Sequence, residues 1–423
     1  MIRARLPFHY AFVVLAATFL SLLAAAGLRS APSVLMLPLQ HAFGWDRGTV
    51  SATAGVGILL YGLVGPFAAA LMQSFGIKRV LLVGLGLMAA ASFASLFMTA
   101  PWQYLLTWGV VSGIGSGAVG GVLGAAVVNR WFAHRQGLMM GILTASTATG
   151  SLIFLPFMAH LSEVGGWRPV VWAVTLALAV LAPIVFFFMP ERPQDVRLGR
   201  FGEPADTPPP PAPHGNRALL AIEVLGRAVK VPTFWLLFAA FFICGLTTNG
   251  LVGTHLIAFC GDHGMAPVHA AGLLSLMGLF DLVGTTASGW LTDRYDAKRL
   301  LFVYYGLRGL SLIALPYLGF GAVSLTSFAI FYGLDWIATV PPTVKLANAR
   351  FGEADGPIVY GWIFTGHQAG AAVAAVGAGL IRQVTGDYGP AFIAAGFTGV
   401  GIALVMLAWP RERAPMAVPV AAE

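Results

Sequence analysis

Twelve separate stretches of this sequence are apolar over about 20 residues or more, the length that a helix needs to cross the hydrocarbon core of a bilayer. They occupy residues 8–38, 49–72, 80–99, 102–128, 137–160, 169–189, 234–259, 266–292, 300–319, 324–348, 357–384 and 390–409. Of the 423 residues, 58% are hydrophobic and 10% are charged, against about 25% charged in an average soluble domain. A water-soluble fold could not bury so much apolar surface, so the sequence predicts an all-α membrane protein with twelve transmembrane helices.

The first stretch follows Arg3 and Arg5, and basic residues before an apolar run are also typical of a secretory signal peptide. The run continues to Pro38, however, and eleven more stretches follow it. We therefore interpret it as the first membrane helix rather than as a segment that is cleaved off.

The basic residues divide unevenly between the two sides of the predicted bundle. If the N-terminus is cytoplasmic, 18 of the 24 Lys and Arg residues are cytoplasmic: Arg3, Arg5, Lys78, Arg79, Arg130, Arg135, Arg192, Arg197, Arg200, Arg217, Arg227, Lys230, Arg294, Lys298, Arg299, Arg350, Arg411 and Arg413. The other six are Arg47, Arg168 and Arg382 outside, and Arg29, Arg308 and Lys345 within spans. Such an excess indicates orientation, so the net charge of +7 does not point to nucleic acid. We expect a multi-pass protein of the plasma membrane, in a bacterium the inner membrane, with both termini cytoplasmic.

A charged, proline-rich segment divides the spans into two sets of six. Proline and small polar residues such as those at 206–216 cannot build a core. The expected parts are an N-terminal bundle at 1–189, a cytoplasmic linker at 190–232, a C-terminal bundle at 233–409 and a cytoplasmic tail at 410–423.

The two sets of spans resemble each other at an offset of about 220 residues, as expected of an internal duplication. Residues 61–65 recur at 280–284, and residues 71–79 recur at 291–299. The repeat predicts two pseudo-symmetric six-helix bundles.

The loop after the eighth span carries a recognisable motif. Gly289, Asp293 and Arg294, followed by a basic pair, resemble the loop signature of the major facilitator superfamily. An aspartate there can cap a neighbouring helix end, and the basic residues can form ion pairs in one conformation only. We therefore predict that Asp293, Arg294 and Arg130 act in gating. The first-half copy has Gln73 in place of the aspartate, so any ionic gate is asymmetric.

Within the superfamily, three segments resemble the branch of monocarboxylate transporters and oxalate/formate exchangers. They are residues 43–51, 129–137 and 366–370. The resemblance implies a secondary active transporter that moves a small organic anion by alternating access. It also implies coupling to protons, a monomeric state and no cofactor.

A few strongly polar side chains lie within the spans, where burying them in the bilayer costs free energy and where they usually have a function. Arg29 in the first span offers a guanidinium fork that suits a carboxylate, and monocarboxylate transporters, by resemblance, carry a basic substrate-binding residue near this position. Asn249 in the seventh span and His367 in the eleventh are the other predicted substrate contacts. The alternatives are that Arg29 extends to the outer surface or pairs internally, and that His367 only packs between helices.

Three ionisable residues of the second half are candidates for proton coupling: Asp281, Arg308 and Asp335. A carboxylate removed from water takes up a proton more readily, which favours Asp281 in the eighth span. In monocarboxylate transporters such an aspartate is followed four residues later by an arginine, but Thr285 stands at that position here. Arg308 and Asp335 have a structural alternative, a buried ion pair. Lys345 lies near the end of its span and is expected to extend to the surface.

Other classes of function lack support in the sequence. The glycines at 115–120 match a dinucleotide-binding pattern but lie inside an apolar span, and no Walker loop is present. No paired nucleophile and base lies in the spans, and no residue spacing fits a metal site, so we expect no catalytic residue, metal or cofactor. The alternative function is a proton-driven exporter of hydrophobic or cationic compounds, with Asp281 and Asp335 attracting the cation.

Overall fold

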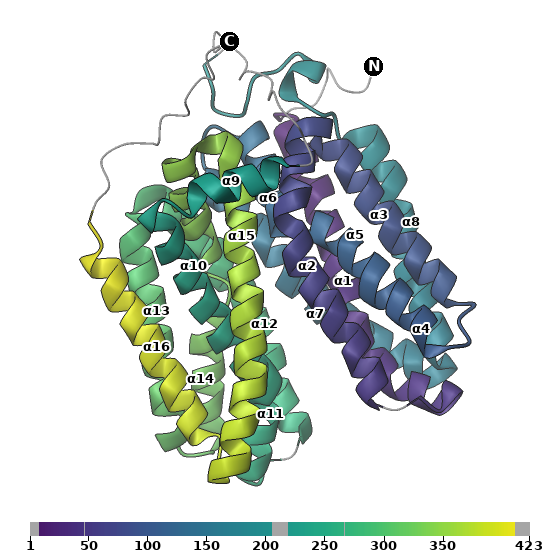
Figure 1. Ribbon diagram of the computed structural model, residues 1–423, viewed down its shortest axis with the longest axis vertical. Helices are drawn as coiled ribbons and strands as arrows, with labels where there is room; N and C mark the ends of the chain where they lie inside the picture. Colours follow the sequence, from purple (N-terminus) through teal and green to yellow (C-terminus); the bar gives the residue numbers. More distant parts are fainter. Residues whose placement is uncertain (1–7, 46, 205–218, 266, 411–423) are drawn as a thin grey trace.

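The computed structural model describes residues 8–45, 47–204, 219–265 and 267–410, and these residues are almost entirely helical (Figure 1). Within these ranges no β-strand forms, apart from an isolated bridge between Phe132 and Phe201. Ten of the described helical stretches are long and apolar enough to cross a membrane, and α7 contains a further apolar helix, Ile153–Gly165. The prediction of an all-α membrane fold is confirmed.

The first half of the chain forms six membrane-crossing rods, the fourth of them in several pieces. The rods are α1 (Ala11–Phe43), α2 (Arg47–Phe75), α3 (Ile77–Ser95), the series α4 (Pro101–Tyr104), η2 (Leu105–Val111), α5 (Ser112–Ala118) and α6 (Gly121–Trp131), then α7 (Gln136–Gly165) and α8 (Trp167–Phe188). Gly44 ends α1 in the left-handed conformation, with φ of 70°, which glycine adopts without steric cost.

The second half repeats this pattern. Its elements are α10 (Pro232–Gly245), η4 (Leu246–Val252) and α11 (Gly253–Asp262), then α12 (Pro267–Arg294), α13 (Ala297–Ala314) with η5 (Leu315–Tyr317), α14 (Ala322–Asp335), α15 (Val340–Thr385) and α16 (Gly389–Ala408). The 46 residues of α15 would extend about 70 Å as one straight helix, far beyond the hydrocarbon core. The chain turns within it at Gly352 (φ 82°, ψ 161°), so α15 completes the tenth rod and forms the eleventh.

The fourth and tenth rods are interrupted midway, whereas the apolar stretches 102–128 and 324–348 suggested continuous helices. α5 ends at Ala118 and α6 begins at Gly121, while α14 ends at Asp335 and α15 begins at Val340. Gly121 and Val340 correspond in the repeat. Interrupted helices at matching positions of two repeats are typical of a central binding site.

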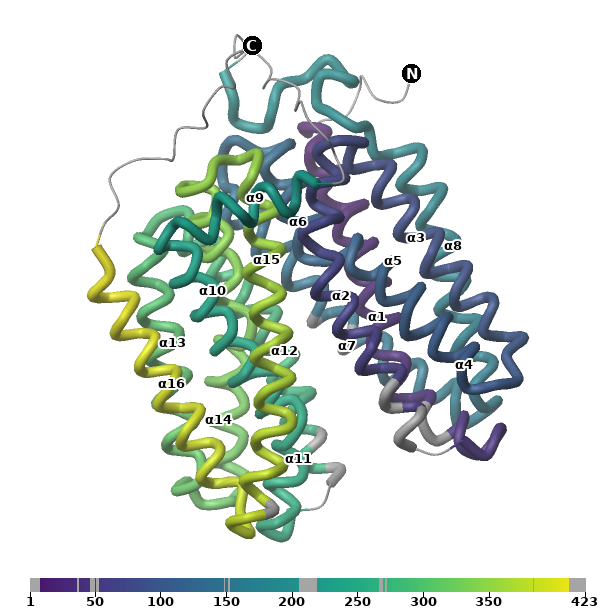
Figure 2. The backbone as a smooth tube through the Cα atoms, in the orientation of Figure 1, coloured from purple at the N-terminus to yellow at the C-terminus, as the bar shows by residue number. Residues whose placement is uncertain are grey.

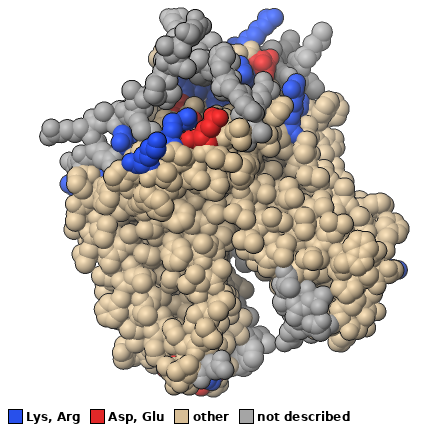
Figure 3. All heavy atoms as spheres, viewed as in Figure 1, with Lys and Arg blue, Asp and Glu red and all other residues tan. Residues whose placement is uncertain are grey.

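The two halves meet at one end of the molecule and diverge toward the other (Figures 1 and 2). We call the first end, where residues 189–204 and α9 (Leu220–Ala228) lie, the linker face, and the opposite end the open end. Lys, Arg, Asp and Glu side chains gather on the linker face, and a gap separates the halves at the open end (Figure 3). One apolar core runs from the first half into the linker-face part of the second, and a separate core fills the open-end part of the second half.

The described parts of the predicted linker pack against both halves, since α9 contacts α2 and α15 and Phe201 pairs with Phe132. Ala221, Val224 and Ala228 of α9 recur at helical spacing and are buried. The Trp362 indole nitrogen donates a hydrogen bond to the Ala221 carbonyl at 3.0 Å, and Arg227 pairs with Asp355 at 2.5 Å. The proline-rich stretch 206–216 lies outside the described residues.

Candidate functional site

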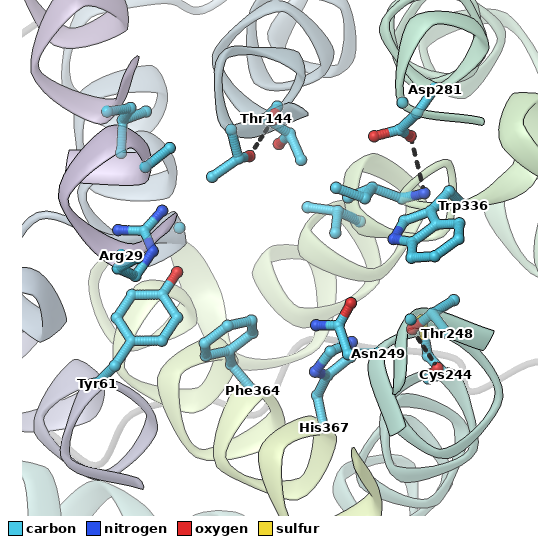
Figure 4. A pocket seen from close by; sticks show the side chains of 18 of the residues that line it. Arg29, Tyr61, Thr144, Cys244, Thr248, Asn249, Asp281, Trp336, Phe364 and His367 are labelled. Atoms are coloured by element: carbon cyan, nitrogen blue, oxygen red, sulfur yellow. Dashed lines mark hydrogen bonds between the residues drawn. The ribbon is translucent and has the colours of Figure 1, made fainter. Parts of the chain in front are cut away.

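A cavity of about 590 Å³ lies between the two halves, beside the interrupted rods. Residues of α1, α2, α6 and α7 form its N-terminal wall, and residues of α10, η4, α12 and α15 form much of its C-terminal wall. Arg29, Asn249, Asp281 and His367 all line it (Figure 4). Four residues predicted from separate spans are therefore brought to one cavity.

Arg29 reaches the cavity from α1 (Figure 4). Its guanidinium carbon lies 4.5 Å from the ring centroid of Tyr61 on α2, a cation–π distance. Its Nη1 atom is buried and has no hydrogen-bond partner among the described residues. A buried donor without an acceptor costs free energy, and the carboxylate of a ligand would supply a charge-assisted acceptor.

His367 and Asn249 lie near each other on the C-terminal wall (Figure 4). The His367 imidazole stacks on the Phe364 ring, with centroids 5.5 Å apart and an angle of 10° between the planes. His367 is 8% exposed, and its Nδ1 atom has no hydrogen-bond partner among the described residues. Asn249 belongs to η4 and is exposed to the cavity. The pair offers polar atoms beside an aromatic surface.

Asp281 holds the interruption of the tenth rod in place. The side chain is 1% exposed, and its Oδ1 atom accepts hydrogen bonds from the Thr285 hydroxyl at 2.7 Å and the Ile337 amide at 3.0 Å. The Ile337 amide lies between α14 and α15, so the helix itself leaves this donor unpaired. The other carboxylate oxygen points toward the cavity (Figure 4).

Arg308 and Asp335 form a buried ion pair outside the cavity lining. The Arg308 Nε atom lies 2.7 Å from Asp335 Oδ2, and the Arg308 side chain is fully buried. The same guanidinium donates to the backbone carbonyls of Asp335 and Trp336, and at 3.1 Å to the Cys244 sulfur. Both carbonyls belong to the end of α14, so the pair satisfies backbone groups that the interruption leaves free.

Comparison with known proteins agrees with this architecture. The family model described as Major Facilitator Superfamily matches residues 17–375. The chain belongs to this superfamily. It is a multi-pass membrane transporter rather than an enzyme.

Two relatives and one solved structure define the likeness further. The transporter is 24% identical over 386 residues to the uncharacterized MFS-type transporter YcxA of Bacillus subtilis, with 89% of each chain covered. It is 27% identical over 402 residues to monocarboxylate transporter 13 of Rattus norvegicus, covering 93% of this chain and 88% of the relative. The crystal structure of the superfamily member FucP in the outward conformation superposes with a TM-score of 0.70 at 16% identity, covering 94% of this chain and 99% of that one. The last likeness shows the fold.

Asp293 joins the two halves of the transporter at the linker face. Its Oδ1 atom accepts from the Gly137 amide at 2.7 Å and its Oδ2 atom from the Leu138 amide at 2.9 Å. These amides open α7, where a carboxylate also interacts favourably with the helix dipole. A Cβ atom on Gly289 would lie 2.4 Å from the Gly137 carbonyl oxygen. Only glycine therefore permits this approach of α12 to α7.

Among the described residues, the other two predicted gating residues form no hydrogen bond or ion pair with the opposite half. Arg294 is exposed, lies 3.9 Å from the Trp290 ring centroid and donates to the Trp290 carbonyl. Arg130 pairs with Glu191, whose carboxylate also accepts from the Ile77 amide at 2.6 Å. Their gating roles remain predictions.

Amide side chains make contacts between the halves that the sequence analysis did not predict. Asn129 and Asn348 are 219 residues apart, correspond in the repeat, and hydrogen-bond to each other at 3.1 and 2.8 Å. Gln73, the counterpart of Asp293, donates to the Ala354 carbonyl. Lys345 is exposed, as expected of a side chain near the end of its span, and also donates to the Thr292 carbonyl. Asn129 and Asn348 carry no charge, and only their matching positions in the repeat could have indicated this contact.

The linker adds a further contact at this face. Arg200 lies 2.6 Å from Glu353 of the second half and 2.8 Å from Glu203 of the linker. The hydrogen bond from Arg200 holds the pKa of Glu203 below its usual range. The linker face is thus closed by carboxylate, amide and guanidinium contacts.

Proposed function

We propose that this transporter moves a small organic anion with a carboxylate group across the plasma membrane by alternating access. The observation that carries the proposal is the Arg29 guanidinium, which lines a cavity between the halves with one buried nitrogen unpaired. The cavity offers a carboxylate a bidentate partner at that point. The names of relatives, among them monocarboxylate transporter 13, support the same class of substrate.

The bodies that move in this proposal are the N-terminal half, 1–189, and the C-terminal half, 233–409. The linker 190–232 and both termini lie on the cytoplasmic side, as the distribution of basic residues predicts. With that orientation, the described conformation is closed to the cytoplasm by the Asp293 contact and open to the outside (Figure 3). Return of the empty or loaded carrier requires the α7–α12 contact to separate.

Asp281 is the proposed proton-coupling residue. It lines the same cavity as Arg29, and its carboxylate is removed from water. Its charge attracts a proton and repels an anionic substrate, so protonation would favour the loaded carrier. Arg308 and Asp335 act in this proposal as supports of the interrupted rod beside Asp281, rather than as groups that exchange protons with solvent.

The test is uptake by the full-length protein in proteoliposomes. Labelled mono- and dicarboxylates are offered with and without an inward proton gradient, to the wild type, Arg29→Gln and the control Arg168→Gln, whose side chain is exposed beside Trp167. We expect saturable carboxylate uptake that Arg29→Gln lowers by roughly tenfold to a hundredfold, because a hydrogen bond to a charged group is worth about 1.5–3 kcal/mol. Arg168→Gln should transport normally.

The opposite result would favour the alternative function. If no carboxylate is taken up, or if both arginine variants behave alike, the anion proposal fails. Asp281 would then be the group in the cavity that attracts a cationic substrate. The next experiment would screen lipophilic cations for proton-driven export.

A further inference from the structure

The C-terminal wall of the cavity is a continuous aromatic surface. Phe364 lies centrally in it, stacked on His367 at 5.5 Å and tilted against Tyr360 at 6.4 Å between ring centroids. Phe241 lies 5.9 Å from His367 and 5.7 Å from Tyr360. All these residues line the cavity. Rings arranged in this way are suited to an apolar or aromatic group of the substrate.

This aromatic surface reaches the arginine wall. The Tyr61 ring contacts the Phe364 ring edge to face, with centroids 5.3 Å apart. The Arg29 guanidinium lies 4.5 Å from the centroid of the same Tyr61 ring. The cation and the aromatic surface therefore belong to one continuous site (Figure 4). A single ligand could contact both.

Trp336 lines the same cavity from the interruption of the tenth rod (Figure 4). Its backbone carbonyl accepts from Arg308 at 3.1 Å, the next amide, of Ile337, donates to Asp281, and the Ala338 carbonyl accepts from Ser288 at 2.5 Å. Three side chains from two other helices thus hold the backbone at residues 336–338, from which the indole extends. The indole is thus held in place as part of the apolar and aromatic lining that is usual in ligand pockets.

The charges of the cavity favour a single anionic group. Among the described residues that line it, Arg29 and Asp281 are the only Lys, Arg, Asp or Glu side chains. Thr285, one helical turn from Asp281, carries no charge and is occupied in holding that carboxylate. A second carboxylate on the substrate would find no second Lys or Arg side chain among these lining residues.

The volume of the cavity also exceeds what a two- or three-carbon acid needs. At about 590 Å³ it falls within the range of about 300–1,000 Å³ that holds drug-sized ligands. A small acid bound at Arg29 would leave the aromatic wall uncovered. The wall and the volume therefore point to an apolar body of about the size of a ring.

We propose that the preferred substrate is a monocarboxylate with a ring-sized apolar body, such as an aryl-substituted 2-oxo or 2-hydroxy acid. Its carboxylate binds Arg29, and its ring packs on Phe364 and Trp336. Trp336 is the residue that sets the preference for the ring. This inference rests on the proposed transport of organic anions and adds the class of anion to it.

The test compares matched probes in the same proteoliposomes. Phenylpyruvate carries a ring and one carboxylate, pyruvate lacks the ring, and benzylmalonate carries the ring with two carboxylates. We expect kcat/KM for phenylpyruvate to exceed that for pyruvate at least tenfold, and benzylmalonate to compete at least tenfold more weakly than phenylpyruvate. In Trp336→Ala the ratio of phenylpyruvate to pyruvate kcat/KM should fall at least fivefold.

Two further variants keep the test decisive. Phe364→Leu preserves apolar volume without the ring, and it should lower the same ratio even if Trp336→Ala does not fold. Trp172→Ala removes an exposed tryptophan of α8 that does not line the cavity, and it should leave the ratio unchanged.

The outcomes separate this inference from the proposed function. Equal or better transport of pyruvate, equal competition by benzylmalonate, or a ratio unaffected by Trp336→Ala and Phe364→Leu would overturn the inference while anion transport stands. Failure of every carboxylate, or indifference to Arg29→Gln, would overturn the proposed function itself.

Discussion

Replacing Asp293 with asparagine should open the linker face. The Asp293 carboxylate accepts two hydrogen bonds from amides of the other half, at 2.7 and 2.9 Å, and each bond to a charged group contributes about 1.5–3 kcal/mol. Asparagine keeps one acceptor oxygen and loses the charge at the start of α7. Because Asp293 is partly exposed, we take the lower end and expect a loss of about 2 kcal/mol, or roughly a 30-fold shift of the conformational equilibrium.

Spin-label distances across the open end would measure this shift. Ala42 lies in the last turn of α1 and Gly261 in the last turn of α11, on opposite sides of the gap, and both are exposed. Labels at these positions, in a chain whose native cysteines Cys244 and Cys260 are replaced by serine, should give mainly the long distance. In Asp293→Asn the short distance, with the open end closed, should gain population.

The matched control is Asp296→Asn, three residues along the chain. Asp296 caps α13 by accepting from the Lys298 and Arg299 amides of its own half, at 3.0 and 3.1 Å. Its substitution should leave the distance distribution as in the wild type. Equal distributions for Asp293→Asn and the wild type would refute the reasoning that the carboxylate holds the linker face closed.

Three other predictions follow from the contacts of the second half. Arg308→Met should lower the thermal unfolding temperature in detergent, because breaking a buried ion pair costs about 3–5 kcal/mol. Adding Asp335→Leu should restore part of that temperature. A double variant that unfolds at a lower temperature than Arg308→Met would contradict this explanation. Asp281→Asn retains an acceptor for the Ile337 amide, so the variant should fold. It should still exchange substrate in a counterflow assay, but its uptake should no longer respond to a proton gradient. Gly289→Val places side-chain atoms against α7, so the spin labels should report a closed open end; an unchanged long distance would show that the α7–α12 approach is not required.

The number and order of membrane spans could be predicted because they depend on the summed hydrophobicity of each stretch of the chain. An apolar stretch of about 20 residues must be helical in lipid, since the backbone has no water to bond to. The positions of Arg29, Asp281 and His367 at one cavity followed from the same logic, because polar side chains within spans face the interior of a bundle. Sequence position and burial rules together were therefore sufficient to place these three residues at one cavity.

The interruptions of the fourth and tenth rods could not be predicted in this way. Hydropathy averages over a window and does not register a few residues whose backbone leaves the helix, such as Val119 (φ −111°, ψ 49°). What makes the tenth interruption stable is a set of side chains distant in sequence, Asp281 and Arg308 among them. Only the tertiary structure shows that these charges bind backbone groups.

The division of roles between the two walls has a consequence for alternating access. A ligand shifts a conformational equilibrium only by the difference between its affinities for the two conformations. In the proposed site, the charged contact at Arg29 belongs to the N-terminal half, and the aromatic contacts at Phe364 and Trp336 belong to the C-terminal half. A substrate that binds both walls spans the interface, so its full binding energy is realised only when the halves stand at the matching separation. A small acid held by Arg29 alone would contact one half and would exert little influence on the other. In this proposal, the apolar body of the substrate is thus the part that can couple binding to the movement of the halves.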